Sequence, residues 1–174
     1  MAARWSFSAG RLLDTPSRRC GLNRERELAA RQQTAEQIYL LGQHLGVSQL
    51  TISTAIVYMR RFYMFHSFTK VQGNAIAQAA LFLAAKVEEQ QLKLEHVLRM
   101  AHSQFKAHEP LPDPKSKTYM KLSQDIIMLE SVLLQTIGFD ITIDHPHAHV
   151  IRCMQFVTAS RELAQTSYFM ATNR

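Results

Sequence analysis

The chain has 174 residues, of which 47% are hydrophobic, and it carries a formal net charge of +6 at pH 7. This length is enough for one domain with a substantial core. No apolar run approaches a membrane-spanning length and the first residues lack the apolar segment of a signal peptide, so we expect a soluble intracellular protein.

Residues 1–27 read as an N-terminal arm that lies on the domain rather than at its centre. A short helix is expected over residues 8–13, followed by a turn-forming stretch around Pro16. Trp5 and Phe7 are the large apolar side chains at its start. Ordinary packing of the arm is the favoured role for these two rings, and a contact with a partner is the alternative.

The centre of the chain predicts a bundle of five helices. The apolar periodicity places them at about residues 26–44, 48–65, 74–89, 94–103 and 116–136. Ser48 and Asn74 are the expected N-caps of the second and third helices. Leu28 of the first helix and Phe65 of the second are assigned to apolar faces. The proline-rich stretch 108–117 is a polar loop. With no strand signal, the predicted fold is all-α.

Two further helices are predicted after Pro146 and Ser160, where new apolar stripes begin. They follow a linker that starts near residue 141. They have the pattern of the first helices of a second bundle, and the chain ends at Arg174 before that bundle is complete.

Two isolated charges are the most informative feature of the sequence. Lys86 is the only charged residue between 71 and 87, and Glu130 is the only one between 126 and 139. A basic side chain that leaves a buried helix must reach solvent or a carboxylate, because a desolvated ammonium is costly. Two lone opposite charges on two core helices are therefore expected to pair. Such an ion pair is weak evidence for stability and better evidence for a site. The alternative is that Lys86 and Glu89 mark the end of a core helix and that Glu130 is solvated.

No catalytic or metal-binding pattern stands out. His145, His147 and His149 lie across a helix start, so their rings point in different directions. Only His145 and His149 could share one face, and no third ligand is near them. Cys20 and Cys153 are far apart and are expected to be free thiols. We therefore predict no enzyme activity, no metal site, no cofactor and no catalytic residue.

Basic residues cluster in the arm and around residues 106–121, without the interleaved aromatic side chains of a base-stacking surface. We expect no direct nucleic-acid binding. The net charge and the adjacent Arg18 and Arg19 nevertheless motivate one alternative function, a basic helical module that binds DNA or nucleoprotein in transcription.

The segments LFLAAKVEEQ and LESVLLQTIGFDI resemble the cyclin box, a five-helix bundle with this lysine on its third helix and this glutamate on its fifth. The segments TPSRR, SQLTISTAIVYMRRFYM, AAKVEEQ, TIDHPHAHV and LAQTSYFMATN resemble the cyclin T group more narrowly. The resemblance implies a first cyclin box over residues 28–140. Residues 141–174 would then be a linker and the first helices of an incomplete second box.

The resemblance also implies a function. Cyclin T is the nuclear regulatory subunit of the elongation factor P-TEFb, whose cyclin-dependent kinase 9 phosphorylates the C-terminal domain of RNA polymerase II. The kinase-binding residues implied by position are Lys86, Val87, Glu89, Glu130, Leu134 and Phe139. A chain that stops inside the second box leaves one more alternative open, namely a decoy that occupies the kinase without activating it.

Overall fold

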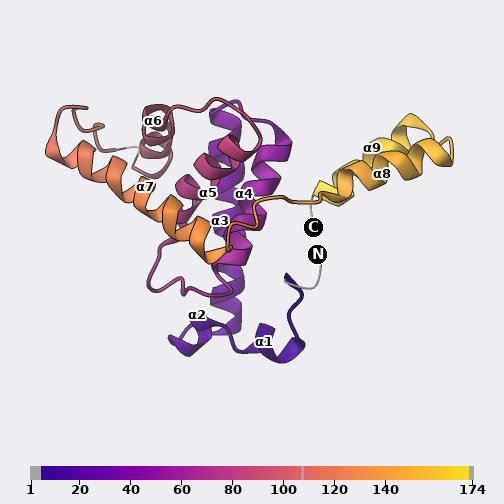
Figure 1. Ribbon diagram of the computed structural model, residues 1–174, viewed down its shortest axis with the longest axis horizontal. Helices are drawn as coiled ribbons and strands as arrows, with labels where there is room; N and C mark the ends of the chain where they lie inside the picture. The colour runs from indigo at the N-terminus through magenta and orange to yellow at the C-terminus, as the bar shows by residue number, and fades with distance from the viewer. Residues whose placement is uncertain (1–4, 107, 173–174) are drawn as a thin grey trace. The chain divides into compact units, whose positions relative to one another are not determined.

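The computed structural model describes residues 5–106 and 108–172. Over these residues the chain forms nine α-helices and no β-strand, as Figure 1 shows. The helices are α1 (Ala9–Leu13), α2 (Pro16–Arg19), α3 (Arg24–His44), α4 (Gln49–Phe62), α5 (Gly73–Val87), α6 (Leu94–Phe105), α7 (Lys117–Thr136), α8 (Pro146–Phe156) and α9 (Arg161–Thr172). The predicted all-α class is confirmed.

The chain divides into two units. The first ends at Ile141 and contains α1 to α7, and the second begins at Thr142 and contains α8 and α9. Among the helices formed by the described residues, none has both the length and the apolar character needed to cross a bilayer.

Helix α5 lies at the centre of the first unit, where it packs against α3, α4, α6 and α7 (Figure 1). Its alanines, among them Ala80 and Ala84, are fully buried and let the neighbouring helices approach closely, while Leu81 and Phe82 fill the space between them. A helix that is apolar around its whole circumference is stable only when all its sides are covered. The prediction that this helix is buried nearly all round is confirmed.

Helix α3 and helix α4 approach each other closely at Gly42. A Cβ atom at this position would lie 2.5 Å from Cγ1 of Ile52, so the contact depends on the missing side chain. Ser48 caps α4 by accepting a hydrogen bond from the backbone N–H of Thr51, as predicted.

The predicted cap of α5 is wrong. The helix begins at Gly73 rather than after Asn74, and its N-cap residue Gln72 makes no side-chain capping bond. The reason lies in packing, since a Cβ atom at Gly73 would overlap the hydroxyl of Thr34 on α3. Close contact between the two helices sets the start of α5, and local capping chemistry does not.

Two predicted core residues are also exposed. Leu28 has 54% of its surface accessible and Phe65 has 46%. In α3 the buried face runs through Glu27 instead of Leu28, because the arm supplies polar partners for that carboxylate. Phe65 lies beyond the end of α4, where the ring of Trp5 packs edge-on against it at 6.3 Å. The start of the arm therefore packs against the end of α4.

The stretch around Pro16 was predicted as a turn and forms the short helix α2 instead. Thr15 is its N-cap and accepts a hydrogen bond from the N–H of Arg18, while Pro16 occupies the first helical position. Proline is favoured there because its missing N–H would have no partner in the helix.

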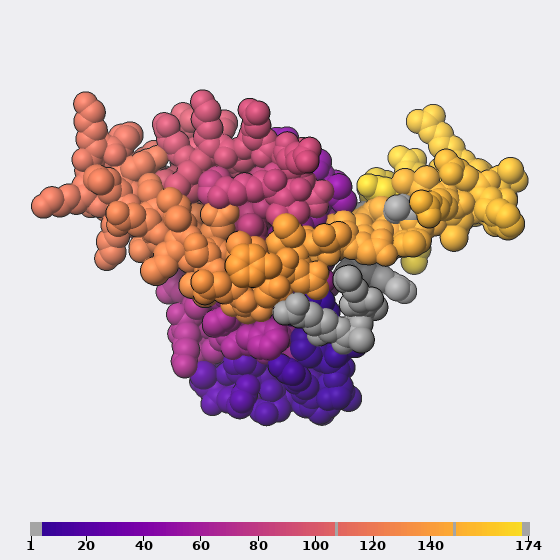
Figure 2. All heavy atoms as spheres, viewed as in Figure 1, coloured from indigo at the N-terminus to yellow at the C-terminus, as the bar shows by residue number. Residues whose placement is uncertain are grey.

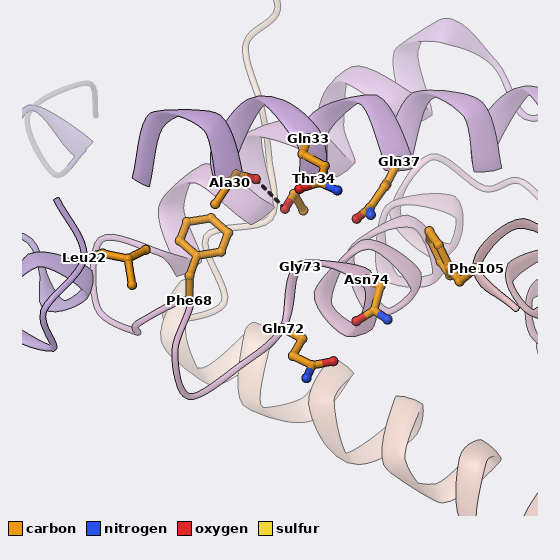
Figure 3. Close-up of a pocket in the computed structure, with 10 residues that line it drawn as sticks. All are labelled: Leu22, Ala30, Gln33, Thr34, Gln37, Phe68, Gln72, Gly73, Asn74 and Phe105. Atoms are coloured by element: carbon orange, nitrogen blue, oxygen red, sulfur yellow. Dashed lines mark hydrogen bonds between the residues drawn. The ribbon is translucent and has the colours of Figure 1, made fainter. Parts of the chain in front are cut away.

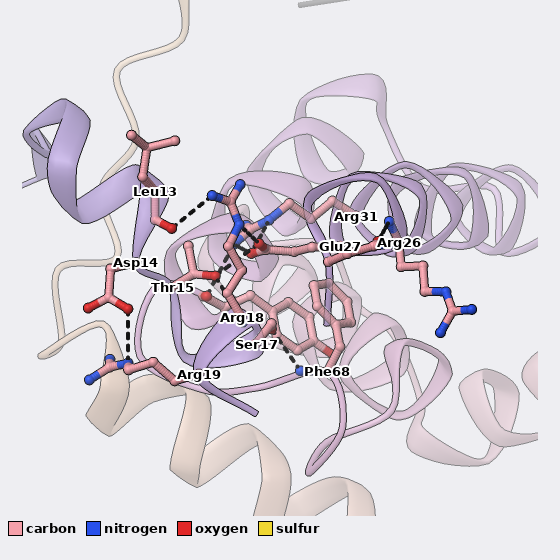
Figure 4. A network of polar contacts seen from close by, with 12 residues as sticks. Leu13, Asp14, Thr15, Ser17, Arg18, Arg19, Arg26, Glu27, Arg31 and Phe68 are labelled. Atoms are coloured by element: carbon pink, nitrogen blue, oxygen red, sulfur yellow. Dashed lines mark hydrogen bonds and ion pairs between the residues drawn. The ribbon is translucent and has the colours of Figure 1, made fainter. Parts of the chain in front are cut away.

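Glu27 of α3 ties this part of the arm to the bundle (Figure 4). One carboxylate oxygen accepts from the Thr15 hydroxyl at 2.9 Å and from Nε of Arg18 at 3.0 Å. The other accepts from Nη2 of Arg31 at 2.8 Å, and Arg31 also donates to the carbonyl of Tyr63. Only 3% of Glu27 is exposed, so three side chains replace its hydration.

Burial raises the pKa of the Glu27 carboxyl, but hydrogen bonds from Arg31, Thr15 and Arg18, together with the charge of Arg31, outweigh it and lower the pKa below the usual 4.5. A carboxyl with a lowered pKa stabilises the fold above its unfolded-state pKa. This contribution is lost as the pH falls through the pKa of the folded state.

We expect Glu27→Gln to lower the free energy of unfolding at pH 7 by about 3 kcal/mol, because two guanidinium groups lose their buried partner. The deficit relative to the native chain should shrink as the pH falls below 4.5. Urea titrations at several pH values measure it, with the exposed Glu25→Gln of the same helix as control. A deficit that is unchanged between neutral and strongly acidic pH would contradict this account.

In the second unit, α8 and α9 pack against each other. Both begin where predicted, at Pro146 and after Ser160. The ring of His147 contacts that of Tyr168 at 4.7 Å between centroids. Several large apolar side chains of this unit are exposed, including Phe156 at 91%.

Candidate docking site

Lys86 and Glu130 form an ion pair. The Nζ atom of Lys86 lies 2.7 Å from Oε1 of Glu130 and 2.9 Å from Oε2, so the ammonium faces both carboxylate oxygens. The Glu130 side chain is 11% exposed and the Lys86 side chain is 53% exposed. The pair therefore joins the end of α5 to the middle of α7 and opens toward solvent on the lysine side.

The local surroundings explain why the pair forms at this place. Lys86 lies in the last turn of α5, where the helix dipole favours a cation. Its ammonium also lies 4.1 Å from the centroid of the Phe82 ring, one turn earlier in the helix. Glu130 is buried on α7, so the alternative interpretation of this residue as a solvated one is wrong.

Both helices end in the same hydrogen-bonded motif. At the end of α5 the N–H of Glu89 bonds to the carbonyl of Lys86, and the N–H of Gln90 bonds to that of Ala85. Glu89 is left-handed with φ of +54°, a conformation that glycine usually supplies at this position. The backbone after Lys86 thus turns sharply away from the helix axis.

At the end of α7 the N–H of Gly138 bonds to the carbonyl of Gln135, and the N–H of Phe139 bonds to that of Leu134. Gly138 has φ of +62°, which confirms its predicted terminating role. Phe139 follows with φ of +58° and its side chain is 67% exposed. The turn therefore presents an aromatic ring to solvent.

Of the predicted kinase-binding residues, all but Glu130 lie at or near these two helix ends, and Glu130 lies in the middle of α7. Glu130 and Leu134 are one turn apart on α7, and the backbone of Phe139 is bonded to Leu134. Val87 is the last residue of α5 and is half-buried, whereas Glu89 is exposed. Figure 2 shows the salmon to orange atoms of α7 running across the visible face of the first unit. We call the six predicted residues Lys86, Val87, Glu89, Glu130, Leu134 and Phe139 the α5–α7 patch.

Residues that the sequence reasoning missed hold the end of α5 in place. Glu88 accepts a hydrogen bond from the Thr54 hydroxyl at 2.7 Å. The side-chain oxygen of Gln90 accepts from the N–H of Ser48 at 2.9 Å and from the Thr51 hydroxyl at 2.8 Å. The polar run that follows Lys86 was the available signal, because such residues beside a buried helix need partners.

A cleft of about 480 Å³ lies between α3, the start of α5 and the end of α6 (Figure 3). Its lining contains the amide side chains of Gln33, Gln37, Gln72 and Asn74 and no charged side chain. The one hydroxyl among these residues, that of Thr34, donates a hydrogen bond to the backbone carbonyl of Ala30.

The histidines of the second unit do not assemble a site. Over the described residues no group of three or more metal-ligating side chains comes together. His149 pairs with Asp144 at 3.3 Å, and the rings of His145 and His147 lie 6.1 Å apart. Cys20 and Cys153 are both free and exposed.

Comparison with known proteins gives the chain its family. Residues 12–142 match the family model of the cyclin N-terminal domain, and residues 145–174 match that of the cyclin-T2-like C-terminal domain. The chain belongs to the cyclin family. It is 58% identical to human cyclin-T1 over 170 residues, 58% identical to human cyclin-T2 over 172 residues, and 55% identical to Drosophila melanogaster cyclin-T over 169 residues. The predicted resemblance to the cyclin T group is confirmed.

These alignments cover 98%, 99% and 97% of this chain but 23%, 24% and 15% of the respective relatives. The chain thus spans about a quarter or less of the length of the curated relatives it matches. Cyclins of this group are regulatory subunits and not enzymes, as predicted. The α5–α7 patch lies entirely within the residues that match the cyclin N-terminal domain.

We expect the Lys86 and Glu130 pair to add little to stability, because the lysine is half exposed and the glutamate pays for desolvation. Lys86→Met alone should cost about 1–2 kcal/mol, since it leaves a buried carboxylate without its partner. The double variant Lys86→Met/Glu130→Leu should recover the native free energy of unfolding, measured by urea titration. A double variant as unstable as the single one would show that the pair is structural.

Proposed function

We propose that this chain binds and activates a cyclin-dependent kinase of transcription, of the cyclin-dependent kinase 9 type, through the α5–α7 patch. The observation that carries the proposal is the ion pair at an exposed edge. A cation that is 53% exposed is joined to a carboxylate that is 11% exposed, and each is the only charged residue of its segment, 71–87 and 126–139. A pair that contributes little to stability yet occupies this position fits a role in recognition.

The pair has hydrogen-bonding capacity left for a partner. Lys86 has three donors, of which Glu130 takes up two by distance, and each carboxylate oxygen has two lone pairs. A kinase segment laid across the patch would find a donor and an acceptor side by side, in the arrangement that backbone carbonyl and N–H groups can satisfy. Fixed polar groups of this kind set the register of an interface.

The apolar part of the patch supplies an anchor. Phe139 is 67% exposed and projects from a turn whose backbone is fixed by hydrogen bonds. Aromatic side chains that enter a pocket of the partner tend to contribute the largest share of binding energy. Leu134 and Val87 are half-buried and would seal the surface around the pair against water.

Activation follows from conformational bias. A protein kinase is competent when its active-site lysine pairs with the glutamate of its mobile helix and its activation loop is ordered. A rigid bundle that binds that helix only in the competent position shifts the equilibrium toward it. In this proposal the chain acts in the nucleus and the kinase phosphorylates the C-terminal domain of RNA polymerase II. No cofactor takes part.

Reversal of either charge in the pair should weaken kinase binding. Lys86→Glu and Glu130→Lys each leave two like charges together in a desolvated patch, so the expected loss is about 2–5 kcal/mol of binding free energy. Surface plasmon resonance with immobilised cyclin-dependent kinase 9 measures it. The control is Lys121→Glu, which changes an exposed lysine on the side of α7 opposite to Glu130.

Native affinity of both reversed variants would refute docking at this patch. The decoy alternative makes the same prediction for binding but differs in activity. Phosphorylation of a polymerase C-terminal repeat peptide by the kinase, with and without the chain, separates the two. An increase in rate supports an activator, and binding without an increase supports a decoy.

The alternative of nucleic-acid binding is weakened by the ion pairs that the arginines of the arm and α3 make within the chain. Arg18 and Arg31 are turned inward to Glu27, and Arg19 lies 3.8 Å from Asp14. We expect no binding of a mixed-sequence DNA duplex at 150 mM salt, as measured by fluorescence anisotropy. Affinity that falls steeply as salt is raised would instead support the alternative, because phosphate contacts release counterions.

A further inference from the structure

The turn that carries Phe139 is strained, and its strain must be balanced by contacts elsewhere. Gly138 and Phe139 are both left-handed, with φ of +62° and +58°. This conformation is unfavourable for a residue with a Cβ atom, because the Cβ atom comes too close to the following carbonyl oxygen. Because the Phe139 ring is mostly exposed, its own packing offsets little of that cost. The contacts of the next two residues therefore decide whether the turn is populated.

Two side chains of α4 hold those residues. Arg61 donates from Nη1 to the backbone carbonyl of Asp140 at 2.9 Å, and its guanidinium lies 3.9 Å from the Asp140 carboxylate. Tyr58 donates its hydroxyl hydrogen to the backbone carbonyl of Ile141. Tyr58 is fully buried, and this burial together with the charge of Glu88 raises the pKa of its phenol, so it remains a donor.

The third contact comes from the other end of the first unit. The indole Nε1 of Trp5 donates a hydrogen bond of 2.7 Å to Oδ2 of Asp140, across 135 positions of sequence. The guanidinium of Arg61 lies 4.3 Å from the centroid of the Trp5 ring. Trp5, Arg61 and Asp140 thus form a closed triangle in which each member contacts the other two.

The triangle is supported by a further layer of rings from the arm and the end of α4. The Trp5 ring packs edge-on against Phe7 at 6.4 Å and against Phe65 at 6.3 Å. The guanidinium of Arg11 lies 5.2 Å from the Phe7 ring and 5.3 Å from the Phe65 ring. Residues 5 to 11 are therefore fixed on the surface beside the turn.

We propose that the N-terminal arm is a positioning element for kinase docking, in which Trp5 holds Asp140 and so keeps Phe139 presented in the α5–α7 patch. The inference rests on the proposed function and adds a residue far from the patch that sets its affinity. Trp5 acts through the population of the turn. An interface whose aromatic anchor is preorganised avoids the cost of ordering it on binding.

The test has a part that does not depend on the kinase. Trp5 is the only tryptophan of the chain, so intrinsic fluorescence reports on the arm alone. Asp140→Ala should shift the emission to longer wavelength and increase quenching by acrylamide, because the indole loses its partner. Leu12→Ala, an exposed apolar residue of the arm, is the control and should change neither. Unchanged fluorescence in Asp140→Ala would overturn the inference.

The second part measures coupling in the full chain. Trp5→Ala should weaken kinase binding about tenfold, the equivalent of one charge-assisted hydrogen bond. In a Phe139→Ala background the same substitution should change the affinity by less than about twofold, because the group that Trp5 positions is gone. Trp5→Phe keeps a ring beneath Arg61 without the N–H donor and should give an intermediate loss. Thermal unfolding of each variant shows that the domain remains folded.

The outcomes separate the two proposals. Kinase binding by the native chain with equal effects of Trp5→Ala in both backgrounds overturns the positioning role and leaves the docking site standing. Absence of kinase binding by the native chain overturns the proposed function and this inference together, even if the fluorescence confirms the triangle. If Trp5→Ala weakens kinase binding only because thermal unfolding shows that the variant has lost the native fold, the inference is also overturned.

Discussion

The structure of the first unit depends on the complete burial of α5. A helix covered by four others can carry a charge only where it leaves the core, and Lys86 occupies that place. The partner must then come from a helix that passes the same end, and Glu130 of α7 meets this condition. The ion pair is therefore a geometric consequence of one buried helix. We expect its net contribution to folding to be small, because the attraction to Lys86 is offset by the cost of removing the Glu130 carboxylate from water. The pair persists at the edge of the fold, where a partner can reach it.

The sequence predicted the parts of the fold that periodicity controls. The burial of α5, the cap at Ser48, the helix end at Gly138 and the starts of α8 and α9 all depend on local patterns and were all found. The pairing of Lys86 with Glu130 was also predictable, because each was the only charge on its segment.

The errors have a common cause in tertiary contact. Asn74 is a good capping residue, yet the approach of Gly73 to Thr34 moves the helix start. Leu28 has the right apolar character, yet Glu27 takes the inward position because Thr15 and two arginines satisfy it.

The positions of Glu27 and Trp5 could not have been derived from the sequence for the same reason. A buried glutamate is unfavourable unless hydrogen-bonding partners replace its hydration. Arg31 lies one turn further along the same helix, but Thr15 and Arg18 come from the arm, and no periodicity indicates that contact. Trp5 was assigned to ordinary packing of the arm, and its packing against Phe65 agrees with that. What the pattern could not contain is the hydrogen bond to Asp140, because no periodicity relates positions 135 residues apart. Sequence reasoning finds the residues that must be buried or paired, and the fold decides which long-range partner each one receives.

The two ends of the first unit therefore converge on one surface. Residues 5 to 11 precede the bundle and Asp140 follows it, yet both meet beside the turn that presents Phe139. A left-handed aromatic residue on the surface is unfavourable by itself and requires support from groups outside the patch. Arg61, Tyr58 and Trp5 supply that support from behind the turn. Under the proposed function, an affinity set by such residues depends on the integrity of the whole unit, so a change in the arm alters docking without any substitution in the patch. Under the proposed function, this dependence would let the rigidity of the fold bias the conformation of the kinase.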